Sequence, residues 1–242
     1  MEYMLWGLGS NLLVSDQGYQ GVAIRLSGEL AQINQQGSRI IAGGGAKLAN
    51  LVNLSGQLEL SGLEWAAAIP ATLGGALFMN AGSFGFSIAS VASKIILLGE
   101  NLEIVELEGA EMPVVGYRNG GISPGMVVLS ANIDLHKDSQ VQEKIYNNLQ
   151  VKKEKFPLDF PNAGSVFKNP VGDYAGRLIE EAGLKGYKHG QAQISTKHAN
   201  FIVNLGGAKA DDIIEIIRFV KAKVKRLYGV ELQTEVKMVG YV

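Results

Sequence analysis

The sequence predicts an α+β fold, in which strands and helices follow one another in mixed order. Short apolar runs bounded by turn residues predict strands, and several longer segments have apolar residues at helical spacing. No regular strand–helix–strand alternation runs through the chain. Of the 242 residues, 47% are hydrophobic and 19% are charged, so the chain can bury a substantial core.

Strands and one helix are expected in the first 135 residues. The apolar runs NLLV (11–14) and GVAIRL (21–26) flank a turn-like segment and predict two strands. Residues 46–60 have apolar side chains near helical spacing and predict a helix. The remaining strands are expected as a pair joined at QQGS (30–45), a hairpin that turns at GENLE (93–109) and a single strand (125–135).

A domain boundary is expected near the segment KEKFPLDFP. The polar residues 138–155 predict a surface helix that ends there, with Val141, Ile145 and Leu149 on its apolar side and Lys152 in the same row. The sequence is therefore divided into a first domain at 1–155 and a second domain at 156–242.

The second domain is expected to begin with a strand at Ser165, in the segment SVF. A helix should follow over 174–183, with Asp173 as its cap and Gly183 at its end. Two more strands are predicted, at 192–195 and 200–206.

The clearest helix covers residues 210–228. Aspartates in its first turn and basic residues in its last turn complement the helix dipole, and Gly229 ends it. Its apolar stripe consists of Ile213, Ile217, Val220, Val224 and Leu227. The segment ELQTEVKMVG predicts a final strand that carries Glu235.

Composition excludes several classes of function. The chain has no cysteine, which excludes disulfides and thiolate metal sites, and its three histidines do not lie at zinc-ligand spacing. We expect no metal, no transmembrane helix and no signal peptide, and therefore a cytoplasmic protein. A pI near 6.3 without interleaved aromatic and basic residues argues against nucleic acid as a partner.

Charge and glycine are unevenly distributed. Residues 1–150 hold 7 basic and 13 acidic side chains (net −6), whereas residues 151–242 hold 15 and 10 (net +5). This asymmetry fits either solvated helix faces or the attraction of an anionic ligand. The 31 glycines gather in clusters such as GLGSN and AGGGAKL, which suit either a turn-rich sheet protein or backbone wrapped around a phosphate-bearing cofactor.

Four polar residues are candidates for chemistry. Ser165 has no obvious general base in the sequence, but a serine hydroxyl can donate a proton to a strongly basic carbanion, with Lys168 favouring the developing oxyanion. Arg118 lies between glycines and could bind a carboxylate or phosphate. Glu235 would need a partner or a proton if it pointed inward, and His198 could be a polar ligand group. The alternatives are a hydrogen-bonded loop serine, a surface arginine, a solvated edge-strand carboxylate and a structural histidine.

Five segments together resemble the UDP-N-acetylenolpyruvoylglucosamine reductase family, whose members are flavoenzymes. The resemblance runs in matching order from about residue 5 to the C-terminus, and it is most specific at AGSVFKNP and EVKMVG. The other segments are GLGSNLLVSDQGYQGVAIRL, GLEWAAAIPATLGGALFMNAGSFG and GYRN. The resemblance implies an FAD-binding domain of the vanillyl-alcohol-oxidase type, followed by a small α+β substrate-binding domain.

The resemblance also implies roles for single residues. Ser165 matches the family's proton donor, and Arg118 and Glu235 match its catalytic arginine and glutamate. Implied FAD contacts are Gly9, Ser10, Asn11, Leu12, Ile69, Thr72, Gly74, Gly75, Asn80 and Gly82. Implied substrate contacts are Tyr117, Lys155, Asn169 and His198.

The implied activity is the NADPH-dependent reduction of UDP-N-acetylglucosamine enolpyruvate to UDP-N-acetylmuramate, a step of peptidoglycan precursor synthesis. FAD and NADPH are the implied cofactors, and a UDP-sugar is the implied substrate. Two alternatives stay open: another FAD-dependent sugar oxidoreductase of the same fold, and a non-catalytic UDP-sugar-binding remnant.

The chain also differs from the usual family pattern. It begins almost at GLGSN, so we expect it to lack the N-terminal stretch that normally precedes this motif. It resembles the type without a substrate-capping tyrosine loop. Further departures occur at SFGFSI, at YRNGG and at GYKHGQAQ.

Overall fold

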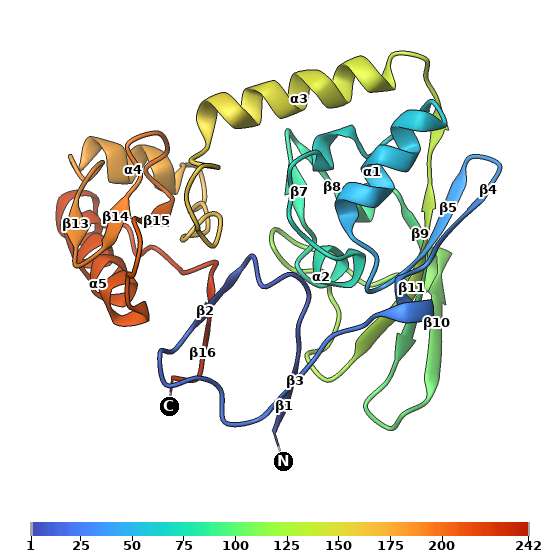
Figure 1. Ribbon diagram of the computed structural model, residues 1–242, viewed down its shortest axis with the longest axis horizontal. Coiled ribbons are helices and arrows are strands. Elements are labelled where there is room, and N and C mark those ends of the chain that lie inside the picture. Colours follow the sequence, from blue (N-terminus) through green and yellow to red (C-terminus); the bar gives the residue numbers. More distant parts are fainter. Residues whose placement is uncertain (1, 242) are drawn as a thin grey trace. The chain divides into compact units, whose positions relative to one another are not determined.

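The computed structural model describes residues 2–241 and divides into two compact units (Figure 1). The central unit comprises residues 3–8 and 23–152, and the C-terminal unit comprises residues 2, 9–22 and 153–241. Each unit has a hydrophobic core of its own. The expected domain division at residue 155 stays a prediction.

The central unit is built on a five-stranded antiparallel sheet in the order β10-β9-β11-β5-β4. The two expected hairpins and the expected single strand are confirmed. Their bounds are β4 (Ile33–Gln36), β5 (Arg39–Gly43), β9 (Ala92–Leu98), β10 (Ile104–Glu108) and β11 (Val127–Asp134).

Helices pack against this sheet and bury its apolar face. The expected helix over 46–60 is confirmed as the shorter α1 (Leu48–Gln57), whose Leu48 and Leu51 are fully buried in one cluster with Ile40 and Ile133 of the sheet. The other two helices that begin in this unit are α2 (Leu73–Phe78) and α3 (Val141–Lys155).

Short strands and 3₁₀ turns complete the central unit. The strand pairs are β1 (Tyr3–Leu5) with β3 (Val22–Ile24), β6 (Leu60–Ser61) with β12 (His136–Lys137), and β7 (Gly82–Ser83) with β8 (Phe86–Ser87). The 3₁₀ turns are η1 (Gly28–Ala31), η2 (Glu64–Ala66), η3 (Ile88–Ser90) and η4 (Gly109–Glu111).

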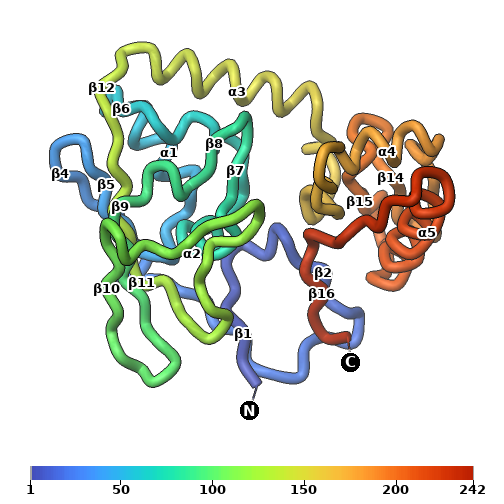
Figure 2. Tube along the Cα trace, turned by 180° about the vertical axis from the view of Figure 1, so that it is seen from behind, coloured from blue at the N-terminus to red at the C-terminus, as the bar shows by residue number. Residues whose placement is uncertain are grey.

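The C-terminal unit packs two helices on a three-stranded sheet and adds a parallel pair, in which β2 and β16 lie side by side (Figure 2). The predicted helix 210–228 is confirmed as α5 (Ala210–Tyr228), which ends at Gly229 with a φ of 71°. The other elements are β2 (Leu12–Val14), α4 (Ala175–Glu181), β13 (Lys188–His189), β14 (Ala192–Ile194), β15 (Ile202–Asn204) and β16 (Lys237–Val239).

Several local expectations are wrong. Ser165 does not begin a strand: the segment 165–167 is irregular and makes one isolated bridge, between Phe167 and Thr234. Glu235 lies before β16, which starts at Lys237.

Two side chains of the C-terminal helices also differ from expectation. Asp173 does not cap α4, because α4 begins at Ala175 and the Asp173 carboxylate accepts from the preceding Tyr174 amide and pairs with Arg177. Leu227 is 49% exposed, so the apolar stripe of α5 ends at the buried Val224. Within the described residues, no helix is both long enough and apolar enough to span a bilayer.

Candidate active site

Backbone hydrogen bonds fix Ser165 in the C-terminal unit. The Val166 amide donates to the Asn200 carbonyl at 2.9 Å. The Asn200 side chain accepts from the Phe167 amide at 2.9 Å and donates to the Phe167 carbonyl at 2.8 Å. Because Asn200 is only 4% exposed, these bonds are shielded from water and hold the half-buried Ser165 in a defined place. Asn200 was not predicted as a site residue, since a single asparagine carries no sequence pattern.

Glu235 lies beside Ser165 in the same unit. Its amide donates to the carbonyl of Val166, the residue after Ser165, at 2.8 Å. The Glu235 residue is 9% exposed, which rules out the solvated edge-strand carboxylate. The backbone segments that carry Ser165 and Glu235 are therefore paired in the C-terminal unit.

The GSN motif (Gly9, Ser10 and Asn11) packs against the segments that carry Ser165 and Glu235. Gly9 has a φ of 72°, which turns the chain so that the Leu12 amide bonds to the Gly9 carbonyl at 3.2 Å. The Asn11 side chain donates to the Glu235 carbonyl at 3.2 Å. A Cβ added at Gly164 would lie 3.8 Å from the Ser10 carbonyl, so the motif also approaches the residue before Ser165. Segments separated by more than 150 positions thus meet at one place.

The predicted substrate contacts of the C-terminal unit have structural partners. The Asn169 Oδ1 accepts from the Ala175 amide at 3.1 Å and so caps α4 in place of Asp173. The His198 ring stacks on Phe156 with centroids 5.0 Å apart, and its Nδ1 accepts from the Asn200 amide at 3.2 Å. Burial, helped by the Lys185 ammonium, lowers the pKa of the His198 imidazole. A neutral His198 therefore supports the Asn200 segment, while Lys155 is exposed.

Arg118 belongs to the central unit and occupies a tight turn. Gly116 and Asn119 close this turn by exchanging backbone hydrogen bonds of 2.8 and 3.2 Å. Arg118 has a φ of 56°, a left-handed conformation that is uncommon for a side chain of this size. Its guanidinium lies 5.1 Å from the centroid of the Tyr117 ring and donates to the Gly82 carbonyl at 3.4 Å. Strained backbone of this kind is concentrated at functional sites.

Asn80 ties the Arg118 turn to the β7–β8 hairpin. Its side-chain amide donates to the Gly116 carbonyl at 3.0 Å, and its Oδ1 accepts from the Ala89 amide at 3.4 Å. Asn80 itself is 9% exposed and has a φ of 43°. The predicted cofactor contacts Asn80 and Gly82 therefore share one hydrogen-bonded network with the predicted catalytic arginine.

The predicted FAD-contacting stretch 69–75 leads into the first turn of α2, where its backbone lies close to neighbouring segments. Thr72 Oγ1 accepts from the Gly75 amide at 3.3 Å, and a Cβ added at Gly7 would lie 2.9 Å from that oxygen. The Gly74 amide donates to the Gly44 carbonyl at 2.8 Å. At Gly75 a Cβ would meet only Thr72 Oγ1, at 3.3 Å. Glycine-rich segments of this kind bring backbone amides close to a ligand.

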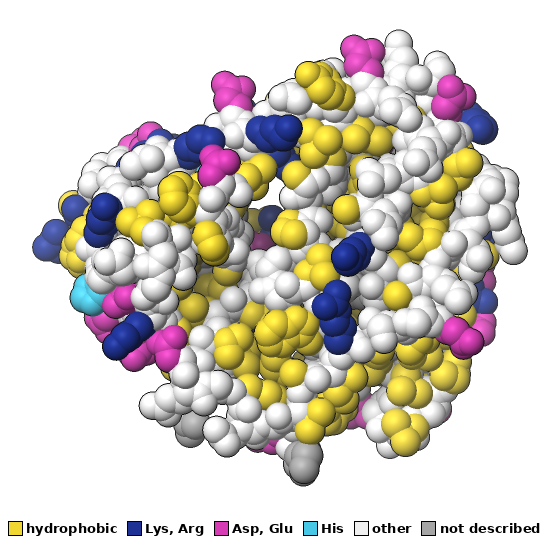
Figure 3. Space-filling model, in the orientation of Figure 1, with side chains coloured by type: hydrophobic (Ala, Val, Ile, Leu, Met, Phe, Trp, Pro, Cys, Tyr) yellow, Lys and Arg dark blue, Asp and Glu magenta, His cyan; other side chains and the backbone are white. Residues whose placement is uncertain are grey.

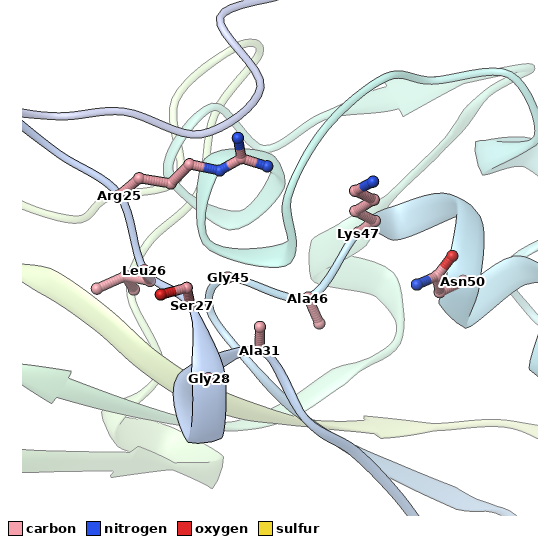
Figure 4. A pocket seen from close by; sticks show the side chains of 9 residues that line it. All are labelled: Arg25, Leu26, Ser27, Gly28, Ala31, Gly45, Ala46, Lys47 and Asn50. Carbon is pink, nitrogen blue, oxygen red and sulfur yellow. The ribbon is translucent and has the colours of Figure 1, made fainter.

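A cationic pocket of about 390 Å³ adjoins this stretch (Figure 4). Its lining residue Lys47 forms a β-bridge with Thr72. Arg25 and Lys47 line the pocket together with Ser27 and Asn50, and its lining contains no carboxylate. In the space-filling view, Lys and Arg side chains lie in the middle of this unit's face and the acidic groups lie nearer its edge (Figure 3). This charge and the flexible donors suit a phosphate group. Neither Arg25 nor Lys47 was predicted from the sequence as a site residue.

Comparison with known proteins identifies the family. The chain is 43% identical over 99% of its length to the UDP-N-acetylenolpyruvoylglucosamine reductase of Caldanaerobacter subterraneus subsp. tengcongensis, of which it covers 80%. This chain belongs to the UDP-N-acetylenolpyruvoylglucosamine reductase family. The reductase of Syntrophomonas wolfei is 42% identical over 98% of the chain, and 80% of its length is covered.

The domain families agree with this membership. The C-terminal domain of the reductase family matches residues 156–239, and an FAD binding domain matches residues 1–100. The crystal structure of the Thermus caldophilus reductase superposes with a TM-score of 0.86 at 35% identity, over 98% of this chain and 85% of that one. The expected α+β fold, with an FAD-binding domain and a C-terminal domain of the reductase family, is confirmed.

Membership does not test the roles of single residues. The structure brings Ser165, Glu235 and the GSN motif together in the C-terminal unit. It brings Arg118, Asn80 and Gly82 together in the central unit. Their catalytic and binding roles stay predictions.

Proposed function

We propose that this chain is an FAD-dependent reductase that uses NADPH to reduce UDP-N-acetylglucosamine enolpyruvate to UDP-N-acetylmuramate. The observation that carries the proposal is 43% identity over 99% of the chain to a protein with this reductase name. The product would enter peptidoglycan synthesis, and we propose that the reaction takes place in the cytoplasm.

FAD would be held by the residues that suit a phosphate-bearing cofactor. The glycine turn of residues 9–12 and the start of α2 offer backbone amides, and the pocket of Arg25 and Lys47 offers positive charge. When bound, the flavin supplies the hydride that the enolpyruvyl double bond accepts. The protein then has to orient the substrate, stabilise charge and deliver one proton.

Ser165 is the proposed proton donor. The buried Asn200 holds the backbone of Phe167, two residues after Ser165, and so supports the segment that carries the hydroxyl. After hydride reaches the double bond, negative charge develops on the adjacent carbon and its carboxylate. A proton from the Ser165 hydroxyl to that carbon completes the lactyl ether.

Arg118 and Glu235 are proposed to stabilise the developing charge. The strained turn presents the Arg118 guanidinium, which can bind a carboxylate through two parallel hydrogen bonds. A protonated Glu235 could donate a hydrogen bond to the same negative charge. Tyr117, Lys155, Asn169 and His198 are proposed substrate contacts, and the positive charge of residues 151–242 favours a diphosphate.

The decisive experiment follows NADPH oxidation by the purified, FAD-loaded protein with and without the enolpyruvyl substrate. NADPH consumption that depends on this substrate is expected. A protein that takes up FAD but oxidises another sugar, with oxygen as acceptor, would support the alternative oxidoreductase. A protein that binds neither added FAD nor NADPH would support the non-catalytic alternative.

Ser165→Ala separates the two halves of the reaction. The variant should still allow NADPH to bleach the flavin absorbance, because that step needs no serine proton. Turnover of the sugar should fall by about 10²-fold or more, the usual contribution of a positioned proton donor. Normal turnover by Ser165→Ala would refute the assignment of the proton donor.

A further inference from the structure

Lys152 is buried without a negative partner. Its residue is 6% exposed, and no carboxylate pairs with it among the described residues. Burial alone lowers the pKa of its ammonium to about 8. Lysine is rarely buried unless it is paired, so this position in the last turns of α3 is costly for the fold.

The Lys152 ammonium instead lies over an aromatic ring, 5.6 Å from the centroid of Phe84. Phe84 forms the tip of the β7–β8 hairpin and has a φ of 54°, followed by Gly85 with a φ of 83°. Two successive positive φ values are typical of a type I′ turn, which favours Asn or Gly where this chain has Phe. A strained aromatic residue and a buried cation therefore meet at one point.

The other end of the hairpin reaches the Arg118 turn. Gly82 pairs with Ser87 in the hairpin, and its carbonyl accepts from the Arg118 guanidinium. A Cβ added at Gly82 would lie 2.4 Å from the Phe86 carbonyl, so the two short strands approach each other closely. A contact that holds the tip at Phe84 consequently helps to hold the Gly82 carbonyl, one acceptor of the Arg118 guanidinium.

We propose that Lys152 is a positioning residue: its cation–π contact with Phe84 holds the β7–β8 hairpin and thereby the guanidinium of Arg118. Its part in catalysis rests on the proposed function, whereas its effect on the hairpin does not. Lys152 touches neither substrate nor flavin in this role.

The test is a double-mutant cycle of Lys152→Met and Phe84→Leu, read by amide hydrogen exchange of residues 82–88 in the full chain. Each single variant should speed exchange about tenfold, the effect of losing one partly desolvated cation–π contact. The double variant should exchange no faster than the faster single variant, because both changes remove the same contact. Unchanged exchange in the single variants, or effects that multiply, would overturn the proposal.

Two controls make the result specific. Lys152→Arg keeps a cation over the ring and should exchange within about twofold of the wild type. Lys153→Met removes an exposed neighbouring charge and should leave hairpin exchange unchanged. Faster exchange in either control would contradict the assigned contact. Phe84→Leu changes a 45% exposed side chain, so it tests the contact even if Lys152→Met does not fold.

Kinetics of the FAD-loaded protein supply a second readout. Lys152→Met should lower kcat for the sugar about tenfold and leave KM within about twofold, because Arg118 acts on charge that develops in the transition state. A change in KM alone would overturn the positioning role. A wild-type protein without reductase activity would refute the proposed function, and hydrogen exchange would still decide the role of Lys152.

Discussion

Asn200 should contribute strongly to stability through its two buried hydrogen bonds, although no sequence pattern marks it. Replacement by alanine removes the acceptor of the Phe167 amide and the donor to the Phe167 carbonyl, at 2.9 and 2.8 Å. Phe167 is 2% exposed, so water cannot replace either partner. Leaving a buried polar group unsatisfied costs about 1–3 kcal/mol, so Asn200→Ala should lower the free energy of unfolding by about 2–5 kcal/mol.

Urea unfolding followed by far-UV circular dichroism reports the helices of both units, so the loss in the C-terminal unit is the part of this transition that tryptophan fluorescence does not follow. Trp6 and Trp65 both lie in the central unit, so tryptophan fluorescence follows that unit in the same samples. A matched control is Asn204→Ala, whose side chain accepts from the amides of Gly206 and Ala208 near the surface. A loss at Asn200 no larger than the loss at Asn204 would refute the reasoning from buried hydrogen bonds.

Two further predictions concern the pH dependence and the core. The pKa of Lys152 is about 8 in the folded chain against an ordinary 10.5, so the folded state penalises its charge fully below about pH 8 and less as the pH approaches 10.5. Between pH 7 and pH 10, the free energy of unfolding of the wild type should therefore rise by about 2–3 kcal/mol relative to that of Lys152→Met. Urea titrations of both proteins at these two pH values measure the rise. The same difference in unfolding free energy between the two proteins at both pH values would contradict this prediction. Val224→Ala should lower the free energy of unfolding by about 1–3 kcal/mol and Leu227→Ala by less than about 1 kcal/mol, because Val224 is fully buried and Leu227 is 49% exposed. Equal losses of stability in thermal unfolding would instead support the predicted apolar stripe that includes Leu227.

Local chemistry was sufficient to predict much of the fold. The hairpins over 30–45 and 93–109 combine β-branched runs with turn residues, and α5 has charges at both ends that suit its dipole and a glycine after its last turn. In each of these elements the residues that determine the structure are neighbours in the sequence. Periodicity and end signals therefore located these elements.

Longer-range contacts explain the failures. The segment after Gly164 looks like a strand because Val166 and Phe167 are apolar, but their backbone groups bond to Asn200 and to residues near 234 instead of a regular ladder. Asp173 was predicted as the cap, yet the first amide of α4 bonds to Asn169, and the Asp173 carboxylate bonds to the Tyr174 amide and to Arg177. The outcome in both cases depends on which partner lies nearby in space.

The candidate site likewise combines residues that were predicted from the sequence with features that only the structure shows. The resemblance pointed to Ser165, Arg118 and Glu235, but only the structure shows that the Glu235 amide bonds to the carbonyl of the residue after Ser165. Arg25 and Lys47 lie 22 positions apart in unremarkable segments, so no sequence signal marked their shared pocket.

The distribution of backbone strain argues independently for a functional region around Arg118. Among the described residues, the non-glycine positions with positive φ are Glu59, Ala68, Asn80, Phe84, Leu102 and Arg118. Asn80, Phe84 and Arg118 are joined through the hairpin and its hydrogen bonds, although they span 39 positions of sequence. Such conformations cost about 1–3 kcal/mol each and persist only where surrounding contacts enforce them. The buried Lys152 adds a further cost at Phe84 of the same network. A fold under selection for stability alone would scatter or remove these costs, so their concentration favours a network that is kept for the placement of Arg118.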